Sequence, residues 1–140
     1  MADDSLERAI QSVRKIIPHF PSKNILQTHQ FYTTVLHFKS SLSQNTVKDQ
    51  PDPTFCAVAI GPGAAANIYF FSALETMRLA PSTAMICMST EGLETYYQAL
   101  KQDGKVKFVE DIENKPWGYR QFEIEDLDEN RLQFFRFLDD

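Results

Sequence analysis

The chain has 140 residues, of which 43% are hydrophobic and 24% are charged, an ordinary composition for a globular protein. This length fits one compact domain, and we expect residues 1–140 to form a single domain. The formal net charge of −5 argues against nucleic-acid binding, which relies on a basic surface. No apolar run approaches the ~18 residues of a membrane span and no signal peptide is recognisable, so we expect a cytoplasmic protein without membrane contact.

The first half of the chain predicts a strand, a helix and further strands. Residues 13–20 predict a short strand, and Asn24 can cap a helix from Ile25 to about His37, with Gln27 as its capping-box partner. The polar stretch 40–53 contains two prolines and predicts a loop or a weak edge strand. Strands are expected at 54–60 and 67–72, with a glycine-proline-glycine link between them.

The second half repeats this order. It predicts a strand at 82–89, a helix capped by Ser89 or Thr90 and ended by Gly104, and three more strands at 105–110, 119–125 and 131–138. The period of about 65 residues is longer than a solenoid repeat, so two copies of one α+β unit are expected. Cys56 and Cys87 lie in apolar runs without metal-ligand spacing and are expected to be buried free thiols.

Several short segments carry a family resemblance. The closing run 116–134 reads as Pro-Trp-Gly, an alternating strand, an acidic turn and a second alternating strand. Upstream lie Pro18, the aromatic pair at 31–32, the Val-Leu-His-Phe segment at 35–38 and the strand 67–73. In order and spacing these segments resemble bleomycin-resistance proteins of the glyoxalase/dioxygenase (vicinal oxygen chelate) superfamily. His37 and Glu129 stand where that pattern has glycine.

The resemblance implies an α+β fold of two βαβββ modules, at about 13–73 and 82–138, which form a curved mixed sheet with outer helices and an inner cup. Because strand side chains alternate between faces, each position can be assigned to the cup or to the core. The residues expected to face the cup are Ile17, His19, Phe55, Tyr69, Phe71, Ala84, Met88, Tyr119, Gln121, Glu123, Gln133 and Phe135. Those expected to form the core are Ile16, Phe20, Val58, Ile60, Phe70, Phe122, Ile124, Leu132 and Phe134.

The metal-binding positions of the superfamily are occupied here by residues that bind metals poorly. By the resemblance these positions are Ile17, Ala84 and Gln133, and Tyr69 stands where glyoxalase I-like members have Glu. An aliphatic side chain and a methyl group offer no lone pair, so a three-ligand open site is not expected. We therefore expect no metal, no other cofactor and no catalytic residue. The alternative is a metal-dependent lyase or dioxygenase with relocated ligands such as His19, Gln133 and Glu123.

The resemblance also implies a ligand. Resistance proteins of this family form homodimers and bind a planar cationic glycopeptide by stacking its tail between aromatic side chains. Phe55 and Trp117, from opposite chains, resemble that stacking pair, and Glu123 and Asp111 are candidates for the acidic part. The residues expected to bind the ligand are Phe55, Tyr69, Phe71, Trp117, Tyr119, Gln121, Glu123 and Gln133. The sequence thus predicts a homodimer that sequesters a small molecule, while a module with a filled cup that serves only dimerisation is a third hypothesis.

Overall fold

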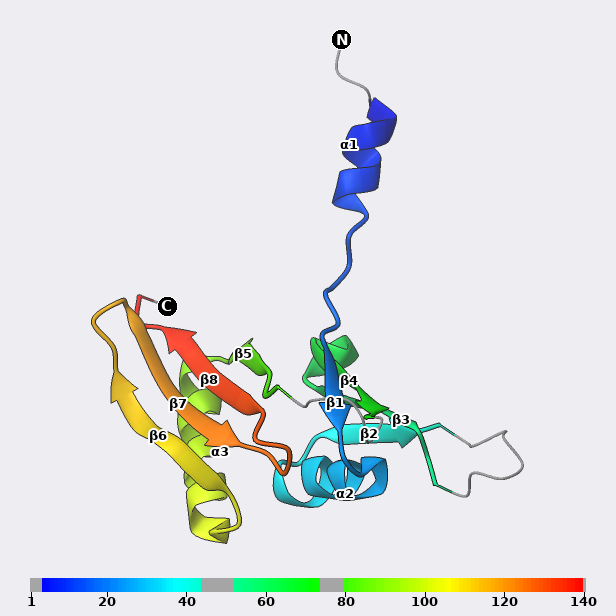
Figure 1. Ribbon diagram of the computed structural model, residues 1–140. Helices are drawn as coiled ribbons and strands as arrows, with labels where there is room; N and C mark the ends of the chain where they lie inside the picture. The colour runs from blue at the N-terminus through cyan, green and yellow to red at the C-terminus, as the bar shows by residue number, and fades with distance from the viewer. Residues whose placement is uncertain (1–3, 44–51, 74–79, 140) are drawn as a thin grey trace.

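The structure, a computed structural model, describes residues 4–43, 52–73 and 80–139. After the N-terminal helix, the first half contributes three helical segments and four strands, and the second half contributes one helix and four strands (Figure 1). The elements are α1 Asp4–Gln11, β1 His19–Ser22, α2 Ile25–Gln30, the π-helical turn Phe31–Val35, β2 Lys39–Leu42, β3 Phe55–Ile60, the 3₁₀ turn Pro62–Ala64, β4 Ala66–Ser72, β5 Thr83–Cys87, α3 Thr90–Asp103, β6 Lys107–Asn114, β7 Tyr119–Glu125 and β8 Arg131–Phe137.

The strands form two four-stranded sheets with the same topology. The first sheet has the order β1-β4-β3-β2 and the second has the order β5-β8-β7-β6. In each sheet the first strand pairs parallel to the fourth, and the other pairs are antiparallel. The helix of each module packs on one face of its own sheet (Figure 1). The fold is therefore α+β and consists of two βαβββ modules, as predicted from the resemblance.

The core lies between each sheet and its helix. The predicted core residues Phe20, Val58, Phe70, Phe122, Ile124, Leu132 and Phe134 are all buried. Ile60 is partly buried against this cluster. The prediction for Ile16 is wrong: its side chain is 86% exposed, because β1 begins only at His19 and Ile16 lies in the extended segment before the strand.

The helix ends follow local signals in the sequence. The Asn24 side chain accepts a hydrogen bond from the Gln27 backbone N at 3.0 Å, and Ser89 Oγ accepts one from the Gly92 N at 3.1 Å. Both caps satisfy a backbone donor that the helix itself leaves free. Gly104 ends α3 with a φ of 67°, and His37 adopts a φ of 63° just after the first helical segment. Each module thus closes its helix with a left-handed residue.

A buried hydrogen-bond network joins the two modules. Tyr32 Oη, from the π-helical turn, donates to Asp126 Oδ2 at 2.7 Å, although the two residues are 94 positions apart in the chain. Asp126 also accepts from Asn130 Nδ2 at 3.0 Å and from the backbone N of Asp128 and Asn130 at 2.9 Å each. Burial raises the pKa of Asp126 above its usual value, although these hydrogen bonds oppose the shift.

Two features depart from the sequence prediction. The N-terminal helix α1 was not predicted, and it contributes no buried residue. Cys56 is buried as expected, and burial raises the pKa of its thiol to about 11. Cys87, in contrast, is exposed, because β5 is an edge strand of its sheet and Cys87 lies on the face opposite α3. Among the described residues, no helix meets the length and apolarity that a bilayer span needs.

Candidate functional site

Each sheet has one face that its own helix does not cover, called here the open face. The register identifies which residues share it, because side chains of directly paired residues point to the same side. In the first sheet His19 pairs with Tyr69 and Phe55 pairs with Phe71. In the second sheet Gln121 pairs with Phe135, and Glu123 pairs with Gln133. All but one of the predicted ligand-binding residues therefore lie in strands that present them on an open face, and Trp117 lies in the turn before β7.

The open face of the first sheet is aromatic. The Tyr69 ring lies 5.6 Å from the His19 ring in a stacked arrangement and 5.0 Å from the Phe55 ring in an edge-to-face arrangement. Phe55, Tyr69 and Phe71 are each partly exposed in the chain. Such pairs leave a ring face or edge free for another planar group.

The open face of the second sheet combines acidic and polar side chains with an aromatic group of Tyr119, Phe135 and Phe137. Glu123 stands in one row with Glu110 of β6 and Gln133 of β8. Glu123 is 6% exposed, and within the described residues its carboxylate has no hydrogen bond or ion pair. Buried carboxylates are normally paired, because removal of a charge from water costs free energy. Tyr119 lies four residues before Glu123 on the same face, and its ring centre is 5.0 Å from that of Phe135.

Trp117 belongs to a closed set of polar contacts at the end of the β6–β7 hairpin. Its Nε1 donates to Gln121 Oε1 at 3.3 Å, and Gln121 Nε2 donates to Glu110 Oε1 at 3.4 Å. Lys115 Nζ lies 2.5 Å from the same Glu110 oxygen, also bonds Glu113, and lies 5.6 Å from the Trp117 ring centroid. Hydrogen bonds to Glu110 and Glu113 raise the pKa of Lys115. The site therefore holds an ammonium group beside an indole that is 58% exposed.

The sequence did not identify Lys115 and Glu110 as site residues. Lys115 directly precedes the Pro-Trp-Gly segment, which is the one local signal that could have placed it near Trp117. Asp111, suggested as an acidic site residue, does not lie with this set. It accepts a hydrogen bond from Tyr97 of α3 and lies 3.8 Å from Lys101 Nζ, on the helix side of the sheet. The bond from Tyr97 is the main reason that the pKa of Asp111 is lowered.

Two residues assigned to the cup from β5 and its end lie on the other face. Ala84 pairs with Leu132 and Ile86 pairs with Phe134, so Ala84, and Met88 two residues beyond Ile86, follow the buried side. Met88 packs partly against the core. The strand residue beside Gln133 on the open face is Met85.

This placement bears on the metal that the superfamily implies. The resemblance places the three metal positions at Ile17, at a residue of β5 and at Gln133. The β5 residue that shares the open face with Gln133 is Met85, a thioether, and not Ala84. Hard divalent ions and zinc need oxygen, nitrogen or thiolate ligands, so this set does not fit such an ion. Among residues 4–43, 52–73 and 80–139 no group of three His, Cys, Asp or Glu side chains could hold a metal ion. His19, one of the alternative ligands, stacks on Tyr69 in the first sheet, whereas Glu123 and Gln133 are in the second.

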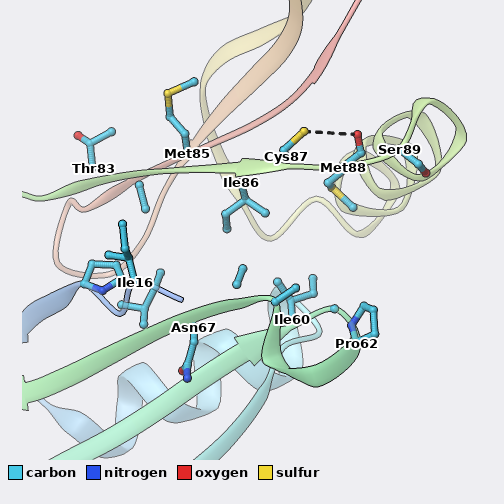
Figure 2. A pocket seen from close by; sticks show the side chains of 16 residues that line it. Ile16, Ile60, Pro62, Asn67, Thr83, Met85, Ile86, Cys87, Met88 and Ser89 are labelled. Atoms are coloured by element: carbon cyan, nitrogen blue, oxygen red, sulfur yellow. Dashed lines mark hydrogen bonds between the residues drawn. The ribbon is translucent and has the colours of Figure 1, made fainter. Parts of the chain in front are cut away.

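A cavity of about 650 Å³ lies between β5 and the ends of β3 and β4 (Figure 2). Ile86 points from β5 into it, while Thr83 and Met85 point to the opposite side of the strand (Figure 2). None of the predicted ligand-binding residues lines it.

Comparisons with known proteins agree with this fold. The glyoxalase-related enzyme from Clostridium phytofermentans superimposes with a TM-score of 0.72 at 21% identity, covering 89% of this chain and 95% of that one. TioX from Micromonospora sp. ML1 gives 0.69 at 14% identity, covering 90% and 100%. TnmS3, an antibiotic binding protein from Streptomyces sp. CB03234, gives 0.68 at 19% identity, covering 90% and 98%. At these identities the likeness shows the shared fold alone.

The sequence itself matches a family model. No match was found among curated proteins. The model of the Glyoxalase/Bleomycin resistance protein/Dioxygenase superfamily, however, matches residues 17–134, which include every strand of both modules except the last three residues of β8. The chain therefore belongs to the glyoxalase/bleomycin resistance protein/dioxygenase superfamily.

Proposed function

We propose that this chain is a single-domain protein that binds a planar cationic small molecule, such as a bleomycin-type antibiotic, and sequesters it without a metal and without chemistry. The observation that carries this proposal is the arrangement at the β6–β7 hairpin. There the protein already holds one ammonium group, that of Lys115, between two carboxylates and beside the exposed Trp117 ring. A cation attached to a planar ligand would meet the same kinds of partner if it took the place of the Lys115 ammonium group.

The second support is the buried Glu123 carboxylate. It lies between Glu110 and Gln133 on the open face and has no partner within the described residues. A cationic group of a ligand could pair with this carboxylate by a charge-assisted hydrogen bond. One solved structure with this fold is described as an antibiotic binding protein, which is compatible with such a ligand.

We further propose that the protein acts as a homodimer, with an aromatic open face from one subunit opposite an acidic open face from the other. In the single chain, no hydrogen bond, ion pair or ring contact among the described residues joins Phe55, Tyr69 or Phe71 to Trp117. A planar ligand held from both sides would therefore need the two faces to be brought together. Aromatic side chains gathered on an uncovered sheet face are commonly buried against another chain.

Isothermal titration calorimetry with metal-free and copper-loaded bleomycin tests the proposal. We expect one ligand per subunit, a dissociation constant near or below micromolar, and affinity about 3- to 30-fold weaker in Trp117→Ala, the range that one cation–π or stacking contact supplies. Leu127→Ala, which removes an exposed apolar side chain from the β7–β8 turn, is the matched control and should bind like the wild type.

Two results would count against this function. If Trp117→Ala bound as tightly as Leu127→Ala, the ligand site would lie elsewhere. If neither form of bleomycin bound the wild-type protein, this drug class would be excluded as the ligand.

A further inference from the structure

The Lys115 side chain carries a charge that the protein keeps largely out of water. It is only 10% exposed, although lysine side chains normally stay in water because the ammonium group is strongly hydrated. Its ammonium group bonds the carboxylates of Glu110 and Glu113 and lies against the Trp117 ring. Lys115 therefore fills a site that is suited to a cation, defined here as the cation site and formed by Glu110, Glu113, Trp117 and Gln121.

An irregularity in β6 brings the two carboxylates of the cation site to one face. Glu110 and Glu113 are three residues apart, and in a regular strand such residues point to opposite faces. The pairing of β6 with β7 shifts between them, so Glu110 pairs with Glu123 and Glu113 pairs with Gln121. Both carboxylates thus reach the open face of the second sheet. Bulges often lie beside functional sites, where they redirect a side chain.

The cation site does not depend on Lys115 for its shape. Lys115 N donates to Tyr119 O at 2.6 Å, which fixes the backbone, but the ammonium group is carried on a flexible four-carbon chain. The remaining groups hold one another, because Trp117 Nε1 donates to Gln121 Oε1 and Gln121 Nε2 donates to Glu110 Oε1. The ammonium group can therefore leave by side-chain rotation while the carboxylates and the indole stay in place.

The carboxylates around the cation site outnumber the cations that they bind. Lys115 pairs with Glu110 and Glu113. Glu123, directly opposite Glu110, is 6% exposed and has no hydrogen bond or ion pair within the part of the chain that the structure describes. A buried carboxylate without a partner is costly. The site thus favours a ligand that brings more positive charge than the single ammonium group of Lys115.

We propose that Lys115 is a resident cation that the ligand has to displace, and that it is thereby a specificity-determining residue. The inference rests on the proposed function, since it concerns the cationic end of the same ligand. The ligand cation takes the carboxylates and the Trp117 ring, and the Lys115 ammonium group moves into water. Because only the open fraction of molecules is competent to bind, the apparent affinity falls by that fraction. A planar cation with further contacts overcomes this cost, whereas a neutral molecule gains nothing from the displacement.

Titration with benzamidine, a planar aromatic cation, tests the displacement. Trp117 is the only tryptophan in the chain, so its indole signal in a nitrogen-15 NMR spectrum reports directly on the cation site. Lys115→Met keeps the length of the side chain without its charge, and it should bind benzamidine about tenfold more tightly than the wild type, or better. Lys115→Arg, which keeps the charge, is the matched control and should bind no more tightly than the wild type. Benzamide, uncharged and of the same shape, should not distinguish the three proteins.

Chemical labelling follows the ammonium group itself in the unaltered chain. An amine-acylating reagent modifies the free amine of lysine, and mass spectrometry of the peptides gives the rate at each residue. Benzamidine well above its dissociation constant should raise the rate at Lys115 about threefold or more, because the hydrogen bonds that raise the pKa of Lys115 are then lost. Lys107, 75% exposed at the start of β6, is the internal control, and its rate should not change. A merely structural role of Lys115 would leave both rates unchanged.

Three results would overturn the inference. They are equal or weaker binding of benzamidine by Lys115→Met, an unchanged labelling rate at Lys115, and no binding of benzamidine by Lys115→Met at all. The labelling decides the question even if Lys115→Met does not fold.

Failure of this inference can be told apart from failure of the proposed function. If bleomycin bound the wild type through Trp117 and gained nothing in Lys115→Met, the ligand site would stand and the displacement would be rejected. If Lys115→Met gained affinity for benzamidine and no protein bound bleomycin, the displacement would stand and the drug would be excluded.

Discussion

The two modules share one topology and differ in the chemistry of their open faces. The first sheet presents His19, Phe55, Tyr69 and Phe71 there. The second presents an acidic and polar set, Glu110, Gln121, Glu123 and Gln133, beside the aromatic residues Tyr119, Phe135 and Phe137. Their helix-facing sides are alike, since Phe70 in one and Phe134 in the other are both fully buried against aromatic neighbours. Packing against the helix thus sets the shared fold, while the open face is free to differ and can carry function.

The difference suggests that the two open faces recognise different parts of a ligand. Aromatic rings stack on any planar molecule, whereas carboxylates select for positive charge. An aromatic half and an acidic half together would recognise a planar cation, and either half alone would be less selective. The comparison between modules can therefore be tested first at the hydrogen bond between Tyr32 and Asp126, which joins the modules, and then at each open face separately.

The largest expected loss of stability comes from removing Asp126, the centre of the hydrogen-bond network between the modules. Asp126→Ala removes the acceptor of the Tyr32 hydroxyl and of three further donors. Because several buried donors then lose their partner, we expect the free energy of unfolding to fall by about 3 kcal/mol or more. Urea denaturation followed by circular dichroism measures this loss. Asp139→Ala, an exposed position after β8, is the control and should change stability little.

The pH dependence of the stability of the same variant tests whether burial outweighs hydrogen bonding in setting the pKa of Asp126. Burial raises the pKa of Asp126 in the folded chain, so the folded state binds this proton more tightly than the unfolded chain, whose Asp titrates near 3.9. Stability from this group is then greatest below about pH 3.9 and declines as the pH rises through the folded pKa. The stability difference between wild type and Asp126→Ala should shrink with rising pH over that window, and a difference that grows would contradict the raised pKa.

The acidic face should control charge selectivity. Glu123→Gln keeps the shape of the side chain and removes its charge, so we expect roughly 10- to 100-fold weaker binding of a cationic ligand, as for loss of a charge-assisted hydrogen bond. An uncharged planar analogue should bind both proteins equally. Tyr69→Phe on the aromatic face is the matched control and should leave the preference for the cation intact. Calorimetric titration of all three proteins with both ligands makes the comparison, and equal losses for both ligands in Glu123→Gln would assign Glu123 a packing role.

Local sequence signals predicted the helix caps and most of the strands, but not β1, which runs His19–Ser22 and not 13–20. Asn24, Ser89 and Gly104 cap their helices as predicted, and polar and apolar residues alternate over 121–125 in β7 and 131–134 in β8. The face of β5 could not be predicted, because Thr83–Cys87 contains only small or apolar residues together with one Thr. Its register with β8 decides the face instead, and this reverses the assignment of Ala84.

The rest of the site depends on contacts that are distant in the chain. Glu110 reaches the open face after an irregularity in the pairing of β6 with β7 between Phe108 and Glu110. Such a bulge changes which residues share a face and has no marker in this sequence. The hydrogen bond between Tyr32 and Asp126 likewise forms only when both modules are folded, because the two residues are 94 positions apart. The position of Asp126 in a turn was predictable from its residue type.

The smallest expected effect compares the helix ends of the two modules. His37 and Gly104 both adopt a left-handed φ, but a residue with a Cβ pays about 1 kcal/mol for it and glycine does not. His37 also lies 3.5 Å from Asp103, a contact between two half-exposed side chains that contributes little to stability.

In an Asp103→Ala background, which removes that contact, His37→Gly should raise the free energy of unfolding by up to about 1 kcal/mol. Gly104→Ala, where a Cβ would meet no atom within 4 Å, should lower it by about the same amount. Opposite signs in urea denaturation would show that backbone strain alone distinguishes these two positions, and a destabilised His37→Gly would mean that the imidazole ring packs more strongly than its exposure indicates.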